Sequence, residues 1–288
     1  MSHKIFYFQE FGVSFDSIGM SLTTDSVLFG SWCGFYLPET ASERMLDAGT
    51  GTGILSLILA QRRPRAEIFA IDIDPRAAAT AARNFALSPW SARLAASPGD
   101  IRSFALGTGK GLAQGGEKGF AAIVSNPPYY KNSPPLKTAV RGLARTEHAW
   151  SAAAFWDLTE RTLEEPGWVA AVFPPERLIE YEKHAAEKGF TVRLATLVSS
   201  RPDLKPYIGF YIFGKEGADL SFPEACDNGA PPPDFQEHFS IRDATGDYSD
   251  YTRALTADLY LYGRRPEPPK KLFPGDGSGN NPAKTPAG

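Results

Sequence analysis

Three glycines occupy alternate positions in the segment Asp47-Ala48-Gly49-Thr50-Gly51-Thr52-Gly53, directly after a short apolar run. Glycine lets the backbone approach a ligand closely, and free N–H groups at the start of a helix can donate hydrogen bonds to that ligand. A dinucleotide-binding turn has the spacing G-x-G-x-x-G, but Ile54 occupies its last glycine position. The segment therefore predicts a ligand-binding turn whose spacing differs from that of a dinucleotide site.

Acidic residues follow the next two apolar runs. Asp72 comes about 20 residues after the turn, where a carboxylate can accept hydrogen bonds from both hydroxyls of a ribose. Asp74 precedes Pro75 and is predicted to cap a helix instead. Asp100 could accept a hydrogen bond from an adenine amino group while Ile101 packs on the ring, although Asp100 taken alone is more typical of an ordinary turn. The ligand is therefore expected to contain a ribose.

The segment Asn126-Pro127-Pro128-Tyr129 follows another apolar run. It resembles the signature of methyltransferases that alkylate a planar nitrogen: adenine N6, cytosine N4 or a glutamine amide. Such a nitrogen is a poor nucleophile because its lone pair is delocalised. The Asn126 side-chain oxygen and the Pro127 carbonyl would accept its two hydrogens and stabilise the positive charge that develops, while Tyr129 would stack on the target base. These three residues are the predicted catalytic residues.

The glycine turn also has the (Asp)-x-Gly-x-Gly-x-Gly spacing of class I S-adenosylmethionine-dependent methyltransferases. This resemblance implies S-adenosylmethionine as the cofactor and S-adenosylhomocysteine as the product. The cofactor-binding residues expected from the turn and the strand ends are Asp47, Gly49, Gly51, Gly53, Asp72, Asp100 and Ile101.

Basic residues gather directly after Tyr129, with no acidic residue before Glu147. They are Lys131, Lys137, Arg141 and Arg145. The whole chain has a net charge of −3, which excludes a protein whose entire surface binds nucleic acid through charge. We therefore expect this basic loop to hold the phosphate backbone of an RNA substrate, with a solvated surface loop as the alternative. Other basic residues are assigned to an extension of the patch (Arg201, Lys205) or to plain surface (Arg62, Arg63, Arg65).

The elements that must position these residues are short apolar runs that alternate with amphipathic stretches. Predicted strands buried on both faces are 44–48, 67–71, 93–96, 120–125 and 168–173. Predicted helices are 54–63, 75–86, 152–163 and 176–188, and two later β-rich runs, 190–198 and 207–213, should close the sheet antiparallel. This alternation predicts an α/β fold with a doubly wound, mostly parallel, seven-stranded sheet and helices on both faces. Ligands bind such sheets at the carboxyl ends of the strands.

Composition narrows the class of protein. The chain has 288 residues, of which 42% are hydrophobic, and only two cysteines, which excludes a disordered protein and a disulfide scaffold. It has no apolar run of the roughly 20 residues that span a membrane, and no start typical of a signal peptide. We expect a cytoplasmic protein that requires no metal, no membrane and no obligate protein partner.

Five segments resemble the bacterial valine-tRNA adenine-N6 methyltransferases, and the likeness covers residues 8–262. The segments are 8–11, 20–32, 88–90, 126–130 and 248–256. The resemblance implies a Rossmann-like class I fold and N6-methylation of an adenine in tRNA, adenine 37 in the anticodon loop of a valine tRNA. It also implies that Asp25, in the Thr24-Asp25 pair, lies beside the methionine part of the cofactor.

The chain is expected to divide into three parts. Residues 1–30 form an N-terminal arm that packs on the cofactor site, and residues 31–262 form the methyltransferase domain. Residues 263–288 form a disordered tail rich in proline and glycine with a net charge of +3, and residues 107–119 form a flexible loop.

Two other functions remain open. Protein-glutamine N5-methyltransferases that modify release factors share the Asn-Pro-Pro-Tyr motif, but they carry a sizeable helical domain before the core, for which the residues before Arg44 are too few. A non-catalytic RNA-binding protein on a methyltransferase fold is the second alternative, and the intact Asn126 and glycine turn argue against it.

Overall fold

The computed structural model describes residues 5–15, 22–106, 119–128, 150–222 and 232–260. Several predictions fall outside these residues. They concern Tyr129, the basic loop with Lys131, Lys137, Arg141 and Arg145, nearly all of the 107–119 loop, and the 263–288 tail.

The centre of the fold is an eight-stranded sheet with the order β10-β8-β9-β7-β6-β3-β4-β5. Its strands are β3 (Arg44–Ala48), β4 (Glu67–Asp72), β5 (Leu94–Pro98), β6 (Phe120–Ser125), β7 (Leu163–Phe173), β8 (Phe190–Ser199), β9 (Ile208–Lys215) and β10 (His238–Ser240). Neighbouring strands from β7 to β5 run parallel, whereas β9 is antiparallel to both β7 and β8. The mostly parallel α/β sheet with an antiparallel closure is confirmed.

The predicted number of seven strands was wrong by one, because the sheet has eight. The eighth strand, β10, pairs parallel with β8 at one edge of the sheet through His238, Phe239 and Ser240. Three residues with one buried side chain give no periodic pattern. A strand of this kind forms only because the edge of β8 offers free backbone partners.

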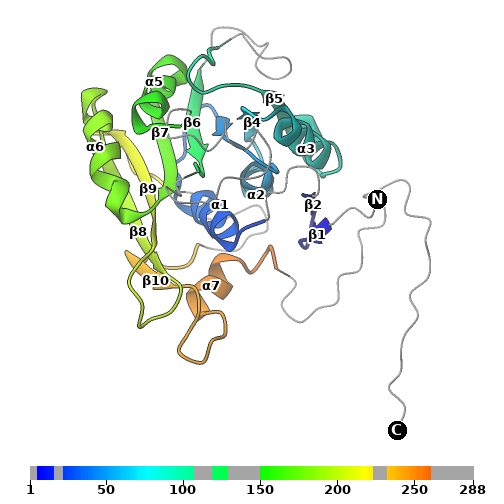
Figure 1. The fold of residues 1–288 in the computed structure, drawn as a ribbon, viewed down its shortest axis with the longest axis vertical. Coiled ribbons are helices and arrows are strands. Elements are labelled where there is room, and N and C mark those ends of the chain that lie inside the picture. The colour runs from blue at the N-terminus through cyan, green and yellow to red at the C-terminus, as the bar shows by residue number, and fades with distance from the viewer. Residues whose placement is uncertain (1–4, 16–21, 107–118, 129–149, 223–231, 261–288) are drawn as a thin grey trace, which may run out of the picture.

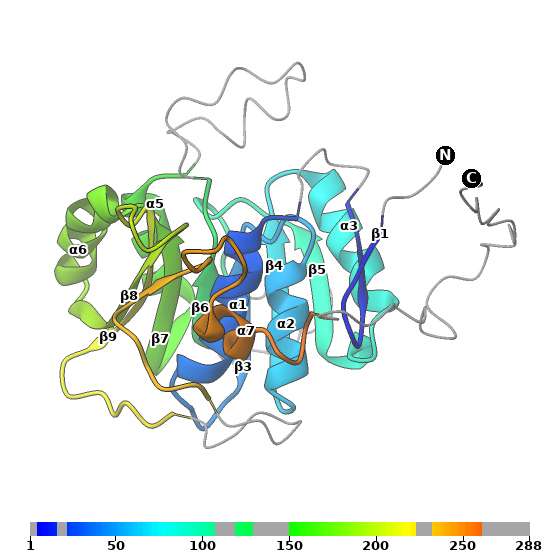
Figure 2. The same cartoon turned by 90° about the horizontal axis from the view of Figure 1, so that it is seen from below.

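Helices lie on both sides of this sheet (Figures 1 and 2). They are α1 (Thr24–Tyr36), α2 (Ile54–Arg62), α3 (Pro75–Ala86), α5 (Ala152–Thr162), α6 (Leu178–Glu187) and α7 (Asp250–Leu255), with 3₁₀ turns η1 (Ser91–Arg93) and η3 (Pro175–Arg177). Figure 1 shows α5 and α6 beside β7 to β9, and α3 beside β5. Strands β3, β4 and β6 are buried almost throughout, which explains why they are continuous apolar runs in the sequence.

The strand order reverses between β3 and β6. From β3 the chain moves outward through β4 to β5, and it then returns to place β6 on the opposite side of β3. A reversal of this kind opens a crevice beyond the carboxyl ends of the two central strands. The glycine turn follows β3 and Asn126 follows β6, so both predicted motifs flank this crevice.

Local signals set the ends of α3 and α6. The Asp74 side chain accepts a hydrogen bond from the Arg76 N–H at 2.9 Å and Pro75 begins α3, which confirms the predicted cap. Gly189 has a φ of 78° directly after the C-cap of α6, as expected for a glycine that ends a helix.

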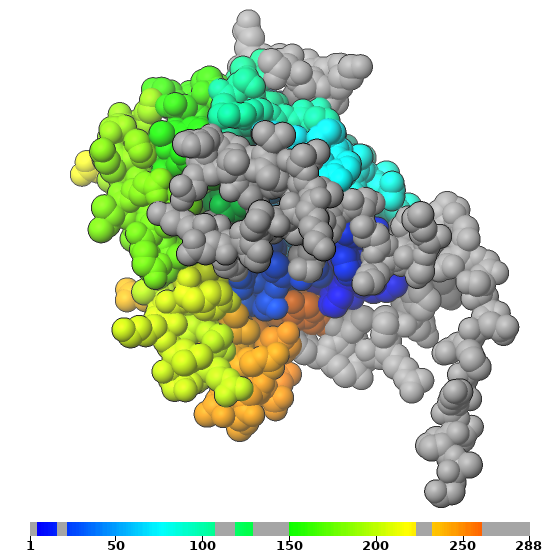
Figure 3. Space-filling view, in the orientation of Figure 1, coloured from blue at the N-terminus to red at the C-terminus, as the bar shows by residue number. Residues whose placement is uncertain are grey.

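The two ends of the described chain pack together, as Figure 3 shows for the blue and orange segments. A two-stranded hairpin, β1 (Ile5–Tyr7) and β2 (Gly12–Ser14), begins the chain. Between its strands, the Gln9 side chain donates hydrogen bonds to the carbonyls of Ala257 and Tyr260, both at 2.8 Å. The segment around α7 therefore bridges the N-terminal hairpin and the body of the domain.

Two arginines predicted to lie on the surface are buried. Arg62 and Arg63 are each 3% exposed, because both satisfy buried groups of α1 and its neighbours. The Arg62 guanidinium donates to the Ser31 carbonyl at 2.5 Å and pairs with Asp258, and Arg63 donates to the Leu37 carbonyl. Arg65 is exposed, as predicted.

Candidate active site

The turn after β3 is built from glycines in a left-handed conformation. Gly49, Gly51 and Gly53 have φ values of 78°, 57° and 83°, which side chains other than glycine adopt rarely. A Cβ atom on Gly53 would also lie 2.5 Å from the Phe85 ring. No side chain caps α2 at Gly53, so the N–H groups at the start of this helix are available to a ligand.

The Asp47 side chain stabilises this turn through hydrogen bonds. Its Oδ2 accepts hydrogen bonds from the Thr50 hydroxyl at 2.7 Å and from the Ser56 hydroxyl at 2.6 Å. The side chain is nearly inaccessible, and burial raises the pKa of its carboxyl group from 3.8 to about 6. Asp47 therefore connects the end of β3, the turn and the first turn of α2.

Asp72 lies at the end of β4, next to the same turn. Its Oδ2 accepts the Gly51 N–H and its Oδ1 accepts the Asp74 N–H, both at 2.9 Å. Each carboxylate oxygen has a second lone pair, so two acceptor positions remain for the ribose hydroxyls. Burial raises the pKa of this carboxyl group as well.

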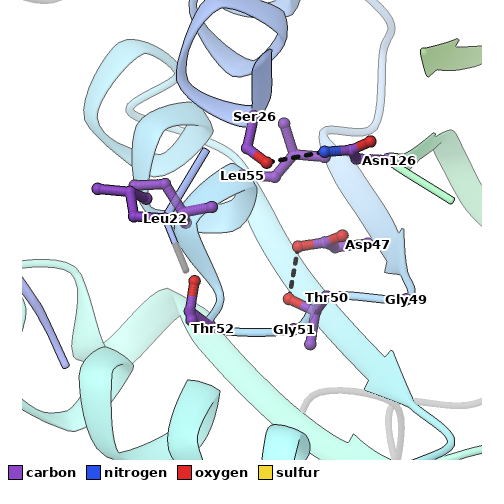
Figure 4. A pocket seen from close by; sticks show the side chains of 10 residues that line it. Leu22, Ser26, Asp47, Gly49, Thr50, Gly51, Thr52, Leu55 and Asn126 are labelled. Atoms are coloured by element: carbon purple, nitrogen blue, oxygen red, sulfur yellow. Dashed lines mark hydrogen bonds between the residues drawn. The ribbon is translucent and has the colours of Figure 1, made fainter. Parts of the chain in front are cut away.

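Asn126 faces the glycine turn from the end of β6. Its amide nitrogen donates a hydrogen bond to the Ser26 hydroxyl at 2.7 Å. Figure 4 shows this nitrogen turned toward Ser26 and the amide oxygen on the opposite side. Pro127 is buried directly beyond it, so the two predicted acceptors come from consecutive residues at one strand end.

Most of these groups line one pocket (Figure 4), whereas Asp72, Gly53 and Pro127 lie next to its lining residues. Its walls come from the end of β3, the glycine turn, the start of α2, the end of β6 and the residues at the start of α1. The lining residues are Leu22, Ser26, Asp47, Gly49, Thr50, Gly51, Thr52, Ile54, Leu55 and Asn126. The structure therefore brings the predicted cofactor turn and the predicted catalytic Asn126 to the same cavity.

The residues of this pocket, together with Asp72 beside Gly51, fit S-adenosylmethionine. Asp47 and Asp72 are buried carboxylates, and in the described ranges no lysine, arginine or histidine forms an ion pair with either of them. A buried carboxylate without a cation is unfavourable. A ligand with positively charged sulfonium and ammonium groups and a ribose would compensate these charges and use the uncapped N–H groups at the start of α2.

Three further residues that were predicted to bind the cofactor do not line the pocket. The Asp25 side chain accepts a hydrogen bond from the Tyr207 hydroxyl at 2.5 Å, and Leu22 and Ser26 of the same segment line the pocket instead. Asp100 pairs with Arg102 through both carboxylate oxygens, and this hydrogen bonding lowers the pKa of Asp100. Ile101 is 4% exposed. The cofactor contacts of these three residues remain predictions.

Sequence reasoning missed Ser26 and Trp150 at this site. Ser26 binds Asn126 from a segment 100 residues away. The ring of Trp150 packs on the glycine turn, so that a Cβ atom on Gly49 would lie 3.0 Å from it. The sequence indicates no more than a core or interface aromatic at Trp150, and no local pattern links either residue to the turn.

Comparisons with known proteins identify similar sequences. A family model described as the methyltransferase small domain matches residues 35–147. The chain is 28% identical over 257 residues to tRNA1(Val) (adenine(37)-N6)-methyltransferases of Yersinia pestis (strain Pestoides F) and Yersinia pseudotuberculosis (serotype O:1b, strain IP 31758). These alignments cover 89% of this chain and 93% of each relative.

Solved structures show the same fold. A protein described as a predicted O-methyltransferase from Agrobacterium tumefaciens superposes with a TM-score of 0.54 at 18% identity, covering 83% of this chain and 98% of that one. A transferase from Pyrococcus horikoshii gives a TM-score of 0.50 at 13% identity, covering 74% and 72% of the two chains.

The fold, the pocket and the matching family model define the chain as an S-adenosylmethionine-dependent methyltransferase of the Rossmann-like class I. Within that class, the likeness to the family of tRNA1(Val) adenine-N6 methyltransferases extends over most of the chain, which confirms the resemblance predicted from residues 8–262.

The described residues contain neither a membrane-spanning helix nor a group of metal-binding side chains. None of their helices is both long and apolar enough to cross a membrane. Nor do they bring three or more histidine, cysteine, aspartate or glutamate side chains together in a group that could hold a metal ion.

Proposed function

We propose that this methyltransferase transfers the methyl group of S-adenosylmethionine to N6 of an adenine in tRNA, adenine 37 of a valine tRNA. The observation that carries the proposal is the position of Asn126 in the pocket formed by the glycine turn. The names of relatives that align with most of this chain support the choice of substrate. The enzyme would act in the cytoplasm, where tRNA is modified.

S-adenosylmethionine supplies an electrophilic methyl group and leaves as S-adenosylhomocysteine. The uncapped N–H groups at the start of α2 and the Asp72 carboxylate would hold it, and the hydrogen bond from Gly51 to Asp72 joins the turn to this carboxylate. Asp47 would add a buried negative charge to the same pocket. The role of this half of the site is therefore to bind and orient.

The other half of the site would activate the acceptor nitrogen. The Asn126 amide oxygen and the Pro127 carbonyl would accept the two hydrogens of the adenine amino group and disfavour delocalisation of its lone pair into the ring. The same two acceptors would stabilise the positive charge that develops as the nitrogen–carbon bond forms. The methylated, cationic amine then loses one proton to water, so no strong base is required.

The substrate would be held by residues that follow Asn126. We assign stacking on the adenine to Tyr129 and contacts with the RNA phosphates to Lys131, Lys137, Arg141 and Arg145. No protein partner is required for this reaction.

Transfer of labelled methyl groups tests the proposal. The purified protein is incubated with labelled S-adenosylmethionine and, in separate reactions, with total tRNA and with release factors, and the modified nucleoside or residue is identified. N6-methyladenosine in tRNA supports the proposal, whereas label in a release factor would transfer the assignment to a protein-glutamine methyltransferase. Cofactor binding without transfer to either acceptor would favour a non-catalytic RNA-binding protein.

A further inference from the structure

Ser26 links the first turn of α1 to the end of β6. Its hydroxyl oxygen accepts the hydrogen bond from the Asn126 amide nitrogen at 2.7 Å and lies 2.8 Å from the Thr23 hydroxyl oxygen. Thr23 is the N-cap of α1 and its hydroxyl oxygen also accepts the Ser26 N–H at 3.2 Å. Ser26 is thus fixed to the helix through both its backbone and its side chain.

The donor to Ser26 from the end of β6 is the Asn126 amide nitrogen. An amide nitrogen can only donate, so the Ser26 oxygen accepts from Asn126. The hydroxyl hydrogen of Ser26 is then available to Thr23, whose oxygen has a second lone pair besides the one that accepts the Ser26 N–H. The Ser26 and Thr23 hydroxyls can share their hydrogen bond in either direction, because each of them can donate and accept.

In this arrangement the nitrogen end of the Asn126 amide faces Ser26. Because the nitrogen and the oxygen of an amide lie on opposite sides of its carbon, a nitrogen held by Ser26 directs the oxygen away from α1, as Figure 4 shows. An amide turned by 180° would offer a donor to the acceptor nitrogen, which needs acceptors for its own hydrogens. One orientation supports the reaction and the other opposes it.

The support for Ser26 is rigid. Beyond its first turn α1 is buried without interruption from Val27 to Tyr36, and Trp32 of this helix donates a hydrogen bond to the Thr196 hydroxyl of β8 at 3.1 Å. A hydroxyl on such a helix holds its position without help from the ligand, and a catalytic group is oriented best by groups that are themselves fixed.

We propose that Ser26 is a positioning residue, which holds the Asn126 amide with its oxygen directed at the methyl-accepting nitrogen. This inference rests on the role of Asn126 in the proposed function, but it applies to any planar nitrogen that the enzyme methylates. Ser26 itself neither transfers a proton nor contacts the acceptor in this proposal.

The central test compares Ser26→Ala with Ser31→Ala, a matched control on the same helix. The Ser31 hydroxyl is buried and has no hydrogen-bond partner in the described parts of the chain. Removal of a hydrogen bond of ordinary strength predicts that Ser26→Ala lowers kcat about three- to tenfold, while the Kd for S-adenosylmethionine stays within about twofold. Ser26→Thr keeps the hydroxyl and should restore most of the rate, and Ser31→Ala should leave kcat unchanged.

A double-variant cycle separates positioning from general packing. If Ser26 acts only through Asn126, adding Ser26→Ala to Asn126→Ala should lower kcat no further. Undiminished kcat in Ser26→Ala, or the same fold-loss in both backgrounds, would overturn the proposal. A reduced affinity for S-adenosylmethionine with normal kcat would also overturn it, because Ser26 would then be a cofactor contact.

A spectroscopic measurement keeps this test independent of the substrate. The side-chain amide NMR signals of Asn126, assigned by their absence in Asn126→Ala, should shift in Ser26→Ala and not in Ser31→Ala; unshifted signals would contradict the proposed contact. Kinetics are then measured with the acceptor that the labelling experiment identifies. Failure of tRNA as a substrate would overturn the proposed function without altering the outcome for Ser26.

Discussion

The Asp72 carboxylate accepts the N–H of Gly51 at 2.9 Å, and this hydrogen bond fixes the end of β4 to the glycine turn that follows β3. A ribose-binding carboxylate and the turn that would approach the rest of the cofactor are thus parts of one unit. Asp72 keeps acceptor capacity beyond this bond.

Replacing Asp72 by alanine should weaken binding of S-adenosylmethionine. Loss of hydrogen bonds to a charged group costs roughly 1.5–3 kcal/mol, which corresponds to about ten- to a hundredfold in Kd. Calorimetric titration of the variant measures the change. Asp74→Ala is the matched control, because it removes the cap of α3 and should lower Tm with little effect on Kd. Equal Kd values for wild type and Asp72→Ala would remove Asp72 from the cofactor site.

Asn126→Ala should separate chemistry from binding. If the amide oxygen acts mainly on the charge that develops during transfer, turnover should fall by about a hundredfold or more while cofactor affinity stays near normal. Tyr129→Phe should preserve activity because the ring still stacks, whereas Tyr129→Ala should weaken substrate use. Steady-state kinetics and calorimetry on the three variants provide the comparison, and a fully active Asn126→Ala enzyme would refute the mechanism.

Cofactor binding should depend on pH through Asp47, whose pKa is raised by burial to about 6. A cationic ligand favours the ionised carboxylate, so affinity for S-adenosylmethionine should fall as the pH drops from 7 to 5. Stability should change in the opposite sense. Because the pKa in the folded state lies above its ordinary value of 3.8, protonated Asp47 stabilises the fold at low pH, and this contribution is lost as the pH rises through about 6.

Calorimetry and thermal unfolding between pH 5 and pH 7 measure both effects of Asp47. In Asp47→Asn, which has no titrating group at this position, both pH dependences should be reduced. An affinity that falls equally steeply in wild type and Asp47→Asn would show that a different group titrates.

Arg62→Ala should destabilise the domain by about 3–5 kcal/mol, because it leaves Asp258 and buried carbonyls without their charged partner. The Arg62 guanidinium donates to the carbonyls of Ser31 and Leu255 and pairs with Asp258. Lys215 forms a pair with Glu165 in which both side chains are exposed, so Lys215→Ala is the control and should cost less than about 1 kcal/mol. Urea unfolding measures both variants, and similar losses would show that burial of Arg62 contributes little.

Binding of tRNA should depend on the basic loop. Arg141→Ala and Arg145→Ala should each weaken binding and reduce the slope of log affinity against log salt by about one unit for each phosphate that is no longer neutralised. Affinity for S-adenosylmethionine should not change. Deleting residues 264–288 tests the basic tail as the competing RNA-binding segment, and we expect the truncated enzyme to keep most of its activity. Abolished tRNA binding on truncation, with normal binding by both arginine variants, would place the RNA interaction on the tail.

Much of the fold could be predicted from the sequence because its signals are local. Strands β3 and β6 and helix α3 occupy the predicted residues, since continuous apolar runs must be buried on both faces and an aspartate before a proline starts a helix. The three motifs at strand ends followed from the same reasoning. Parallel strands place their carboxyl ends at one edge, so Asp47, Asp72 and Asn126 had to lie close together once the strands were recognised.

Contacts between distant segments were decided only by the tertiary structure. Ser26 reaches Asn126 across 100 residues of sequence, and Arg62 is buried because α1 and the segment after α7 cover it. Strand β10 forms because β8 has a free edge. No local sequence pattern indicates the partners of these residues, because a hydrogen bond or ion pair between distant residues depends on the path of the whole chain. The sequence by itself predicted which residues gather at the strand ends, whereas only the tertiary structure decided that Ser26 at the start of α1 binds the Asn126 amide.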